Sequence, residues 1–487
     1  MKRTVKALLV SSLLLTASLA AAQEFETGYF LGGNPYAFRL NPAFQSERNF
    51  FSLVTGQTGL GTWSNLGVST LLYPGNDGKL YTFMNDRVSA SEVLGKVKKR
   101  NSLDADLHLN LLTVGFWSRE NTFMTIDVNL RSLNALSVPY DLFRFWKEET
   151  EGSSTFDFSG VGGRSKTFGE IAFGWSRNFN DVFNVGFRAK ALVGLAEAEM
   201  RMRNLTMTMS DERWEVTAEG ELNMSSPAFS VRKDADGNLD LKSIEIREDA
   251  ISPAGFGAAV DLGFSWNVLP LLTVSGSVLD LGTIRWNRDI RGATPAGTFS
   301  WVPSEKEPVD ASSGAKESFD QEMDEAVKSI AGLFKFKDAG SGQGAFDLLP
   351  FRVNLAAEYR MPFYERLSVG ALYTGRGGSC YSRHTSRLSL NWNPTDYLSL
   401  STGTTLNKLG QSLGFAFSLH PAGVNLMLGC DYLPFRCVSI APILKDLPAK
   451  YSRFAIIPAD RMNLNLYVGL NVALGSRRLD YARRMTD

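Results

Sequence analysis

Histidine and cysteine are scarce in this chain of 487 residues, which contains three of each. The histidines are far apart and lack metal-ligand spacing, at positions His108, His384 and His420. This spacing excludes a histidine-based zinc site and a histidine-dependent catalytic triad. The cysteines are too few for a disulfide scaffold, at positions Cys380, Cys430 and Cys437. The last two could bridge a short loop, but an odd set leaves at least one thiol free.

Long hydrophobic runs are missing after the first 22 residues. The most apolar later stretch, residues 268–281, is interrupted by Pro270, Gly276 and Asp280. A membrane-spanning helix needs about 20 apolar residues, so the chain beyond this point can cross a membrane only as a closed barrel. Neither charge sign is in excess, with 51 acidic and 51 basic side chains, and no nucleic-acid partner is expected.

The N-terminus has the features of a secretory signal peptide. Cationic residues in Met1–Lys6 precede an apolar run from Ala7 to Ala20 that is short for a membrane span. Alanines 20–22 then offer the small residues that a signal peptidase accepts. We expect residues 1–22 to be removed and the mature chain to begin at Gln23, and the alternative is an uncleaved anchor helix.

The dominant pattern along the chain is an alternation of apolar and polar residues, which is typical of β-strands with one dry and one wet face. In residues 461–474, apolar side chains occupy every second position from Met462 to Leu474. That run is longer than an ordinary globular strand of about 5 to 6 residues. Similar runs occupy residues 103–111, 124–130, 213–224, 256–266, 351–361, 367–373, 388–392 and 413–419.

Short polar turns join many of these runs, at residues 118–121, 178–181, 362–365 and 393–396. Their Asn, Asp and Pro residues favour hairpins, so we predict one antiparallel sheet of about 14 strands. Residues 89–100 and 139–149 instead have the pattern of short amphipathic helices, which we expect on the barrel or across its mouth as lids. Residues 303–343 form a charged insert with a helical centre, which predicts a long loop, a lid or disorder.

Alternation alone does not say whether the apolar face meets lipid or a protein core, so a soluble β-protein stays as the alternative. The strand lengths match the ~9 to 11 residues that cross a bilayer at a tilt. Aromatic residues also collect near strand ends, as an interfacial girdle requires, including Trp117, Trp175, Trp266, Trp392 and Tyr397. We therefore predict an all-β transmembrane barrel in contact with the lipid of a Gram-negative outer membrane.

Two motifs near the mature N-terminus, Tyr29–Asn34 and Leu40–Phe44, resemble a family of Bacteroidetes outer-membrane proteins of unknown function. That family is a distant relative of the FadL-type outer-membrane transporters, whose N-terminal region also carries an Asn-Pro-Ala motif. The similarity continues through residues 64–67, 101–107, 209–214 and 279–286, so it spans most of the chain.

The resemblance implies a barrel over residues 49–475, with an N-terminal segment at residues 23–48 that folds into the lumen as a plug. By motif match, Asn41, Pro42 and Ala43 lie in that plug, where they have either a gating role or the plainer role of an Asx-type turn before the first strand. Two features depart from the family pattern. Residues 476–487 form a charged tail after the last strand, and no fatty-acid pocket can be matched.

One stretch has the spacing of a calcium loop. Oxygen side chains occupy loop positions 1, 3, 5, 7 and 12 of the EF-hand pattern, contributed by Asp234, Asp236, Asn238, Asp240 and Glu245. Leu239 replaces the glycine of position 6, so a hairpin turn at residues 236–238 is favoured over calcium. No cofactor is expected. Residues 410–414 match the nucleophile-elbow pattern but precede a strand instead of a helix, so we do not expect an enzyme.

Two functions fit such a barrel. The first is passage of small hydrophobic or amphipathic solutes past the plug, through a lumen lined by Arg352, Asn354, Glu358, Arg360, Asn463, Asn465 and Asn471. The second is a non-conducting structural or assembly barrel, which holds envelope or secretion proteins through its loops and tail. Solute flux favours the first function, and a co-purifying protein partner without flux favours the second.

Overall fold

The computed structural model describes residues 26–475, apart from residues 302–335 and 440–455 and the shorter stretches 55, 75–79, 86, 120, 149–152, 181, 211–212, 248–251, 295–296, 379–381, 408–409, 434–436 and 459–462. The expected signal peptide, the charged tail and the helical centre of the insert lie outside the described residues.

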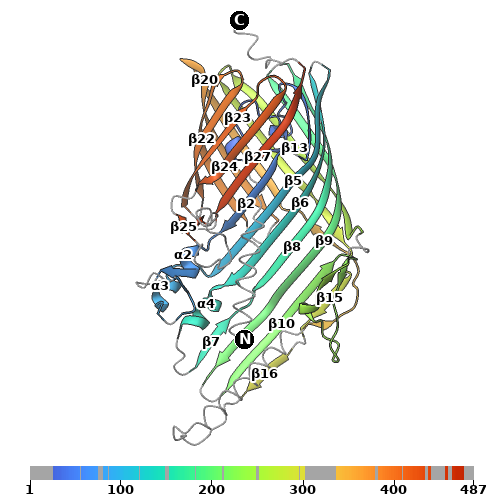
Figure 1. The fold of residues 1–487 in the computed structure, drawn as a ribbon, viewed down its shortest axis with the longest axis vertical. Helices are drawn as coiled ribbons and strands as arrows, with labels where there is room; N and C mark the ends of the chain where they lie inside the picture. Colours follow the sequence, from blue (N-terminus) through green and yellow to red (C-terminus); the bar gives the residue numbers. More distant parts are fainter. Residues whose placement is uncertain are drawn as a thin grey trace, which may run out of the picture.

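Fourteen strands of the described chain close into one antiparallel barrel, which confirms the predicted fold class (Figure 1). Neighbouring strands pair in chain order, and β27 (Leu464–Leu474) closes the ring by pairing with β1 (Asn49–Leu53) and β2 (Thr58–Ser64), which together form the first strand. The strands between them are β5 (Arg100–Arg119), β6 (Thr122–Pro139), β8 (Gly162–Phe179), β9 (Phe183–Met209), β13 (Gly255–Leu269), β14 (Leu272–Trp286), β19 (Phe351–Met361), β20 (Tyr364–Gly377), β21 (Arg383–Thr395), β22 (Leu398–Asn407), β23 (Gly410–Leu419) and β24 (Val424–Leu433).

Short turns join these strands at the upper end of the barrel in Figure 1. The four predicted polar turns fall between β5 and β6, β8 and β9, β19 and β20, and β21 and β22. Asn180 in the second turn has a φ of 55°, a left-handed conformation that asparagine adopts more readily than most residues. The predicted polar turns therefore connect neighbouring strands of the barrel, as the sequence indicated.

The outer face of the barrel is apolar. On β27, Leu466, Val468, Leu470 and Val472 are 39–45% exposed, whereas Asn465 between them is 2% exposed and faces the lumen. Residues near the turn end of the barrel include exposed aromatic side chains such as those of Trp266, Trp392, Tyr397 and Phe179. An apolar band with aromatic rings near one edge is the outer surface that a membrane barrel presents to lipid.

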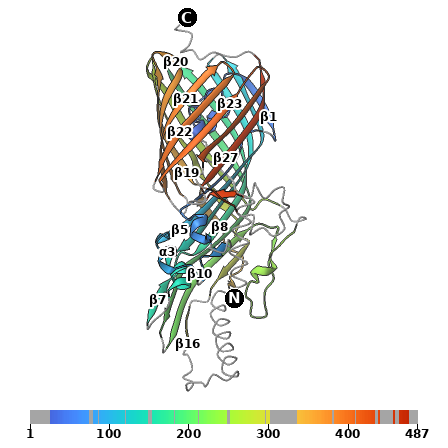
Figure 2. The same ribbon diagram turned by 60° about the vertical axis from the view of Figure 1, so that its left-hand side comes forward.

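β9 is 27 residues long and belongs to two parts of the sheet. Its first part, up to Gly194, pairs with β13 in the barrel, and its second part pairs with β10 (Trp214–Ser225) outside it. Four short strands extend the outer part, namely β7 (Ser154–Asp157), β15 (Ile290–Ala293), β16 (Gly297–Trp301) and β17 (Lys337–Asp338). We call β7, β10, β15, β16, β17 and the second part of β9 the extension, which projects beyond one end of the barrel (Figure 2).

The alternation in β10 has a different meaning from that in the barrel strands. Its apolar residues Val216, Ala218 and Leu222 are 1–6% exposed and pack in a core with Met202 and Phe336. Counting residues 213–224 with the lipid-facing strands was therefore wrong, because this strand lies in the extension, where protein covers its apolar face.

The two predicted helices are present in shorter form, as α3 (Ala90–Leu94) and α4 (Tyr140–Lys147). Ser89 begins α3, since its side chain accepts a hydrogen bond from the Glu92 N–H at 3.3 Å. Val93 of α3 and Phe143 of α4 are buried in the same hydrophobic cluster. The two helices lie beside the extension (Figure 1).

The remaining elements are short. They are α2 (Val68–Leu71), β3 (Leu72–Pro74), β4 (Leu80–Thr82), β11 (Phe229–Ser230), η3 (Leu241–Ser243), β12 (Glu245–Ile246), β18 (Ala345–Leu348), β25 (Cys437–Ser439) and β26 (Ile456–Pro458). Among the described residues, no helix is long and apolar enough to cross a bilayer. Cys430 on β24 is a buried free thiol.

Candidate functional site

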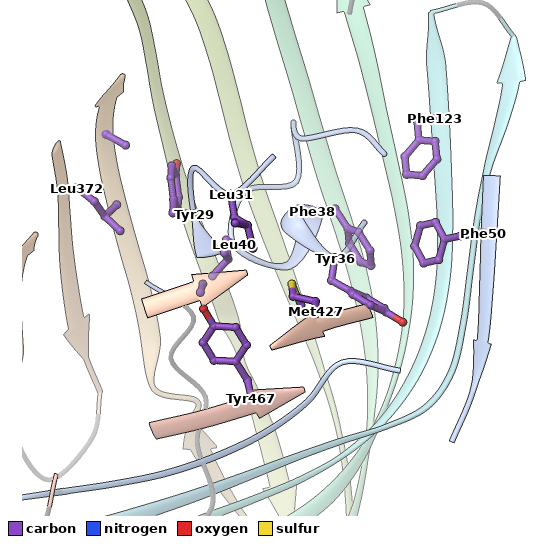
Figure 3. Packing of buried hydrophobic residues seen from close by; sticks show 12 residues of the cluster. Tyr29, Leu31, Tyr36, Phe38, Leu40, Phe50, Phe123, Leu372, Met427 and Tyr467 are labelled. Atoms are coloured by element: carbon purple, nitrogen blue, oxygen red, sulfur yellow. The ribbon is translucent and has the colours of Figure 1, made fainter. Parts of the chain in front are cut away.

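Residues 26–48, which we call the N-terminal segment, lie inside the barrel. The segment contains two short 3-10 turns, η1 (Glu26–Gly28) and η2 (Ala37–Arg39). Five of its apolar side chains are at most 5% exposed, namely Tyr29, Leu31, Tyr36, Phe38 and Leu40, and Phe30 and Phe44 are partly buried. They pack with wall residues from several strands of the ring, including Phe50, Phe123, Leu372, Met427 and Tyr467 (Figure 3). The segment therefore brings an apolar cluster into a lumen whose wall is mainly polar.

Asp431 on β24 holds the start of the segment. Its carboxylate accepts hydrogen bonds from the backbone N–H groups of Glu26 at 3.2 Å and Thr27 at 2.6 Å. Thr385 donates to Glu26 Oε1 at 2.7 Å, and Arg387 donates to Thr27 Oγ1. Buried hydrogen bonds to charged groups contribute about 1.5–3 kcal/mol each, so this end is firmly attached to β21 and β24.

Asn41 connects the Asn-Pro-Ala motif to another part of the wall. Its Oδ1 accepts a hydrogen bond from the Ala43 N–H at 3.0 Å, which is the Asx-type turn that the sequence allows. Its Nδ2 donates to the Phe264 carbonyl oxygen on β13 at 2.9 Å and to the Tyr29 hydroxyl at 3.3 Å. The same side chain therefore shapes the local turn and fastens the segment to the wall.

Two glycines make room for this motif. Gly186 on β9 and Gly263 on β13 are directly paired across the two strands. A Cβ at Gly263 would overlap Asn41 Oδ1 and approach Pro42, and a Cβ at Gly186 would overlap the Pro42 carbonyl group. The wall is therefore recessed at the place where Asn41 and Pro42 sit.

The backbone next to the motif is also held. The Leu40 carbonyl oxygen accepts hydrogen bonds from Ser277 Oγ on β14 at 2.7 Å and from Asn354 Nδ2 on β19 at 2.9 Å. Asn354 also donates to Ser277 at 3.0 Å and accepts from Thr374 Oγ1 on β20 at 3.0 Å. These contacts attach the segment to a third region of the ring.

Arg39 attaches the end of η2 to β5 and β6. Its Nη2 lies 3.1 Å from Thr113 Oγ1, 3.0 Å from Asn129 Oδ1 and 3.5 Å from Asp127 Oδ1. Its Nη1 donates to the Gln57 carbonyl oxygen at 3.1 Å. The Arg39 side chain is only 7% exposed, and its charge is tolerated here because a carboxylate and several neutral acceptors surround it.

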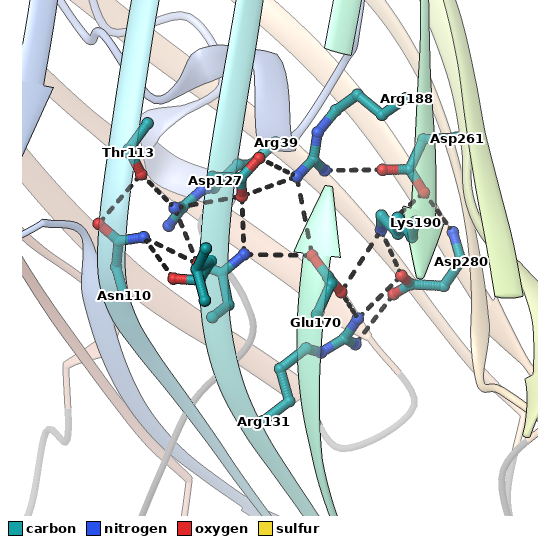
Figure 4. Close-up of polar contacts among 12 residues, drawn as sticks. Arg39, Asn110, Thr113, Asp127, Arg131, Glu170, Arg188, Lys190, Asp261 and Asp280 are labelled. Carbon is teal, nitrogen blue, oxygen red and sulfur yellow. Dashed lines mark hydrogen bonds and ion pairs between the residues drawn. The ribbon is translucent and has the colours of Figure 1, made fainter. Parts of the chain in front are cut away.

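Asp127 joins Arg39 to a set of charged side chains on the lumen wall (Figure 4). Arg188 on β9 lies 2.8 Å from Asp127 Oδ2 and 2.7 Å from Asp261 Oδ2 on β13. Lys190, on the same face of β9, lies 2.8 Å from Asp261 Oδ1. All four wall residues are at most 6% exposed. Alternate positions on adjacent strands thus place opposite charges side by side.

The set continues to Asp280, which has an unusual backbone conformation. Its φ is 60° within β14, and the β13–β14 register shifts at the same level. The Asp280 N–H donates to Asp261 Oδ1 at 2.7 Å, and Asp280 Oδ1 accepts a hydrogen bond from Lys190 Nζ at 2.6 Å. Arg131 on β6 contacts Asp280 with both Nη atoms, at 2.9 and 3.0 Å, and Glu170 on β8 at 2.9 Å. We call Arg39, Asp127, Arg131, Glu170, Arg188, Lys190, Asp261 and Asp280 the lumen cluster.

The seven expected lumen residues are distributed along the wall. Arg352, Asn354, Asn465 and Asn471 are at most 7% exposed, and Glu358 and Arg360 on β19 are half-buried. Asn465 donates to Asp431 at 2.7 Å and so supports the residue that holds the start of the segment. Asn471 accepts from Asn425 at 3.1 Å. Asn463 precedes β27 and accepts a hydrogen bond from the Ser64 N–H at 2.8 Å.

The weak calcium candidate has two of its carboxylates engaged within the protein. The Asp234 carboxylate accepts hydrogen bonds from the backbone of Asp236 and Asn238, at 3.0 and 2.8 Å, and from the Asn238 side chain. Glu245, the twelfth position, pairs with Arg232 at 2.7 Å. Asp240 lies in the same loop, and the described residues contain no group of side chains arranged to hold a metal ion. The loop has the geometry of a turn closed by Asp234.

Sequence reasoning did not single out the lumen cluster. A signal was present, since Asp127, Asn129 and Arg131 lie at alternate positions of one strand, and Arg188 and Lys190 do so in another. Charged residues on the wet face of a long strand mark a lumen position. Which charges meet depends on the register between strands, which the sequence does not state.

Comparisons with known proteins give one family and several distant folds. No curated protein matches the chain. The Ralstonia pickettii toluene transporter TbuX is similar over 91% of this chain and 94% of its own, with 9% identity and a TM-score of 0.43. The Pseudomonas putida toluene transporter TodX covers 95% of this chain and 100% of its own, with 7% identity and a TM-score of 0.38. A Pseudomonas aeruginosa FadL homologue is similar over 93% of this chain and 96% of its own, with 12% identity and a TM-score of 0.34.

These structural similarities are too distant to support an argument about function. The family comparison is more direct, because one family model matches residues 42–431, from within the N-terminal segment to β24. The chain therefore belongs to the family of unknown function DUF5723.

Proposed function

We propose that this protein resides in the outer membrane and admits small hydrophobic or amphipathic solutes, with the N-terminal segment as the plug that controls passage. The observation that carries the proposal is the attachment of one segment to three regions of the ring. In the first region, the start of the segment at Glu26 and Thr27 contacts β21 and β24. In the second, Leu40 and Asn41 contact β13, β14 and β19. In the third, Arg39 contacts β5 and β6. A segment held by such contacts obstructs the lumen and can be displaced without breaking a covalent bond.

The apolar cluster of the segment gives the proposal its solute class. Tyr29, Leu31 and Phe38 are buried against one another and the wall, among polar wall side chains. A hydrophobic solute that displaced the segment would take over apolar contacts of this kind. Burial of apolar surface contributes about 25 cal/mol per Å², so a polar solute would gain far less in the same place.

The wall also has an irregular seam next to the segment. β1 pairs with β27 up to Phe51 and Val472, and the pairing resumes in β2 at Thr58 and Val468. Between these pairs the first strand has more residues than β27, and Val54 has a φ of 60°. The Tyr36 hydroxyl of the segment donates to the Leu470 carbonyl oxygen there at 3.5 Å. We place the lateral exit toward lipid at this seam.

A reversible lock tests the proposal. A Cβ at Gly32 would lie 2.8 Å from Ser399 Oγ on β22 and 2.5 Å from Asn393 Oδ1, so Gly32→Cys with Ser399→Cys can form a disulfide when the end of the Asn393 side chain turns away. The variant is made in a background where the three native cysteines are serine. Uptake of a radiolabelled medium-chain alcohol is measured in intact Gram-negative cells that lack their own hydrophobic-solute channels.

We expect uptake in the reduced state, loss of uptake on oxidation and recovery on reduction, with each single-cysteine variant unaffected by oxidation. Uptake that is the same in both redox states, despite a formed disulfide, contradicts plug control. Absence of uptake in every state contradicts transport.

The second function is a non-conducting assembly barrel, and the extension favours it. The extension gives the protein a large folded surface outside the barrel, where a protein partner has access. A stoichiometric partner that co-purifies with the wild-type chain and is lost when β15 and β16 are replaced by a short linker, together with absent uptake, would support this function.

A further inference from the structure

Alternate residues of β6 mark successive levels of the lumen between the N-terminal segment and the extension. Asn129 contacts Arg39 of the segment at 3.0 Å. Further along β6, Leu133 and Ala135 line a cavity of about 40 Å³, which we call the small cavity. Ala135 and Ser137 line a groove of about 830 Å³ beside the extension. The small cavity therefore adjoins the groove and lies between it and the segment.

An ion pair crosses the lumen at the small cavity. Arg376 Nη1 on β20 lies 2.7 Å from Asp106 Oδ2 on β5, and both side chains are 9% exposed. Both residues line the small cavity. On one side of the ring β6, β8, β9, β13, β14 and β19 lie between these two strands, and on the other side β21, β22, β23, β24, β27 and the first strand do. The ion pair therefore joins opposite walls of the barrel.

Other charged side chains gather at the same level. Asp104, on the same face of β5, lines the small cavity and interacts electrostatically with Arg376. Arg164 and Lys166 on β8 also line it, and both pair with Asp347 on β18, the first at 2.8 Å. One water needs roughly 10–15 Å³ by this measure, so the described side chains leave room for only a few waters here.

An ion pair is suited to a closure that can open. The desolvation cost of two buried charges offsets much of their Coulomb attraction. The side chains of Arg376 and Asp106 can therefore separate at a small net cost where water from the adjoining groove hydrates them. No hydrogen bond of the barrel wall has to break for this movement.

We propose that Arg376 and Asp106 form a second closure of the lumen, in series with the N-terminal segment, which keeps water-soluble molecules in the groove away from the lumen cluster. The segment closes the lumen with an apolar cluster, and the ion pair closes it nearer to the extension. The lumen cluster then lies in a chamber between two closures. The inference goes beyond the plug and does not depend on transport, because it concerns access from the groove.

The labelling rate of a single cysteine measures this access. His108 lies two residues from Asp106 on β5 and lines the cavity beside the lumen cluster, so His108→Cys places a thiol on the segment side of the ion pair. Ser137→Cys places a thiol in the groove. Each change is made in a background where the three native cysteines are serine. The full-length processed protein in detergent micelles is treated with aminoethyl methanethiosulfonate, a small water-soluble thiol reagent.

We expect labelling at position 108 to be roughly tenfold or more slower than at position 137, because a buried thiol reacts only when the closure opens. Arg376→Met removes the cation with little change in volume, and Asp104→Asn with Asp106→Asn removes both carboxylates beside it. Each of these neutralised variants should raise the rate at position 108 by roughly tenfold. Arg376→Lys keeps a cation and should stay slow.

The two neutralised variants change the local charge in opposite senses. A purely electrostatic effect on the thiol or on the cationic reagent would therefore move their two rates in opposite directions, whereas loss of the closure raises both. Arg203→Gln, at an exposed pair with Glu221 in the extension, is the control and should leave the rate at position 108 unchanged. Limited proteolysis of the N-terminal segment should also be unchanged in all these variants, which shows that the reagent does not enter past the segment.

Equal labelling rates at positions 108 and 137 would overturn the inference, and that comparison requires no change at the ion pair. Rates that stay the same or move in opposite directions in the two neutralised variants would overturn it as well. So would labelling of the Arg376→Lys variant as fast as that of Arg376→Met. The carboxylate variant keeps the comparison usable if Arg376→Met does not fold. Failure of this inference would leave control by the segment standing, because uptake with the locked segment is measured separately.

Discussion

Gly263 on the barrel wall lies directly beneath Asn41 of the N-terminal segment, so closely that a Cβ at Gly263 would overlap the Asn41 side-chain oxygen. The paired Gly186 has the same relationship to Pro42. Two strands of the wall therefore lack side chains at the one level where the Asn-Pro-Ala motif rests. The recess and the motif are complementary parts of a single contact.

Filling the recess should release the motif. Gly263→Ala forces Asn41 and Pro42 away from the wall, at an expected cost of about 1–3 kcal/mol in the free energy of unfolding. Uptake of hydrophobic solute should rise at the same time, because the segment no longer seats. Gly169→Ala on β8 is the matched control, since the nearest atom to its added Cβ would be the Val193 carbonyl oxygen at 3.9 Å. Equal thermal unfolding midpoints for the two variants would contradict the recess.

Removing the charge of Arg39 should loosen the segment. Arg39→Met loses the contacts to Thr113, Asn129 and Asp127, and we expect about 1–3 kcal/mol of destabilisation, because Asp127 keeps its pair with Arg188. Limited proteolysis of the protein in micelles should cut the N-terminal segment faster than in the wild type. Arg366→Met breaks an exposed ion pair and should cost under about 1 kcal/mol without faster cleavage. Identical cleavage rates in all three proteins would show that Arg39 does not hold the segment.

The two roles of Asn41 can be separated by Asn41→Asp. The aspartate keeps the oxygen that accepts from the Ala43 N–H, but it loses the donation to Phe264 and Tyr29. If the wall contact matters, stability falls by about 1–3 kcal/mol, because the Phe264 carbonyl oxygen then faces a carboxylate without a donor. Asn41→Ala loses the turn as well and should be at least as unstable. Wild-type unfolding and uptake in Asn41→Asp would reduce the motif to a local turn.

The lipid-facing band can be tested on β19. Leu355 is 53% exposed on the outer face, and Leu355→Lys should cost roughly 2–4 kcal/mol in lipid if it lies near the middle of the bilayer. Ile244, which is 41% exposed outside the barrel, is the control, and Ile244→Lys should change stability by under about 0.5 kcal/mol. The measurement is urea unfolding in phospholipid vesicles. Similar costs at both positions would argue against a lipid-facing band.

The barrel was predictable because its strands repeat one simple pattern. Residues 351–361 were expected as a strand and form β19 with the same bounds, and the alternation near the end of the chain recurs in β27. The same pattern was misleading in β10, where burial against Met202 and Phe336 replaces contact with lipid. Alternation reports which residues share a face, and it does not report what covers that face.

The site was predictable only in part. Resemblance to a family placed Asn41 and its neighbours in the lumen, but the role of Arg39 and of the lumen cluster was missed. The meeting of Arg131 with Asp280 depends on a register shift and on a left-handed residue within a strand. Such bulges leave little trace in the sequence, so cross-strand partners of charged residues could not be assigned from it.

The strand β9 is shared by the barrel and the extension, so the two are joined by one continuous backbone. The same strand carries Gly186, Arg188 and Lys190 at the seat of the N-terminal segment and then, without a hinge loop, the ladder with β10. A movement of the extension would therefore be transmitted along one hydrogen-bonded strand to the part of the wall where the N-terminal segment is seated. The extension and the seat of the N-terminal segment are thus two regions of one continuous strand.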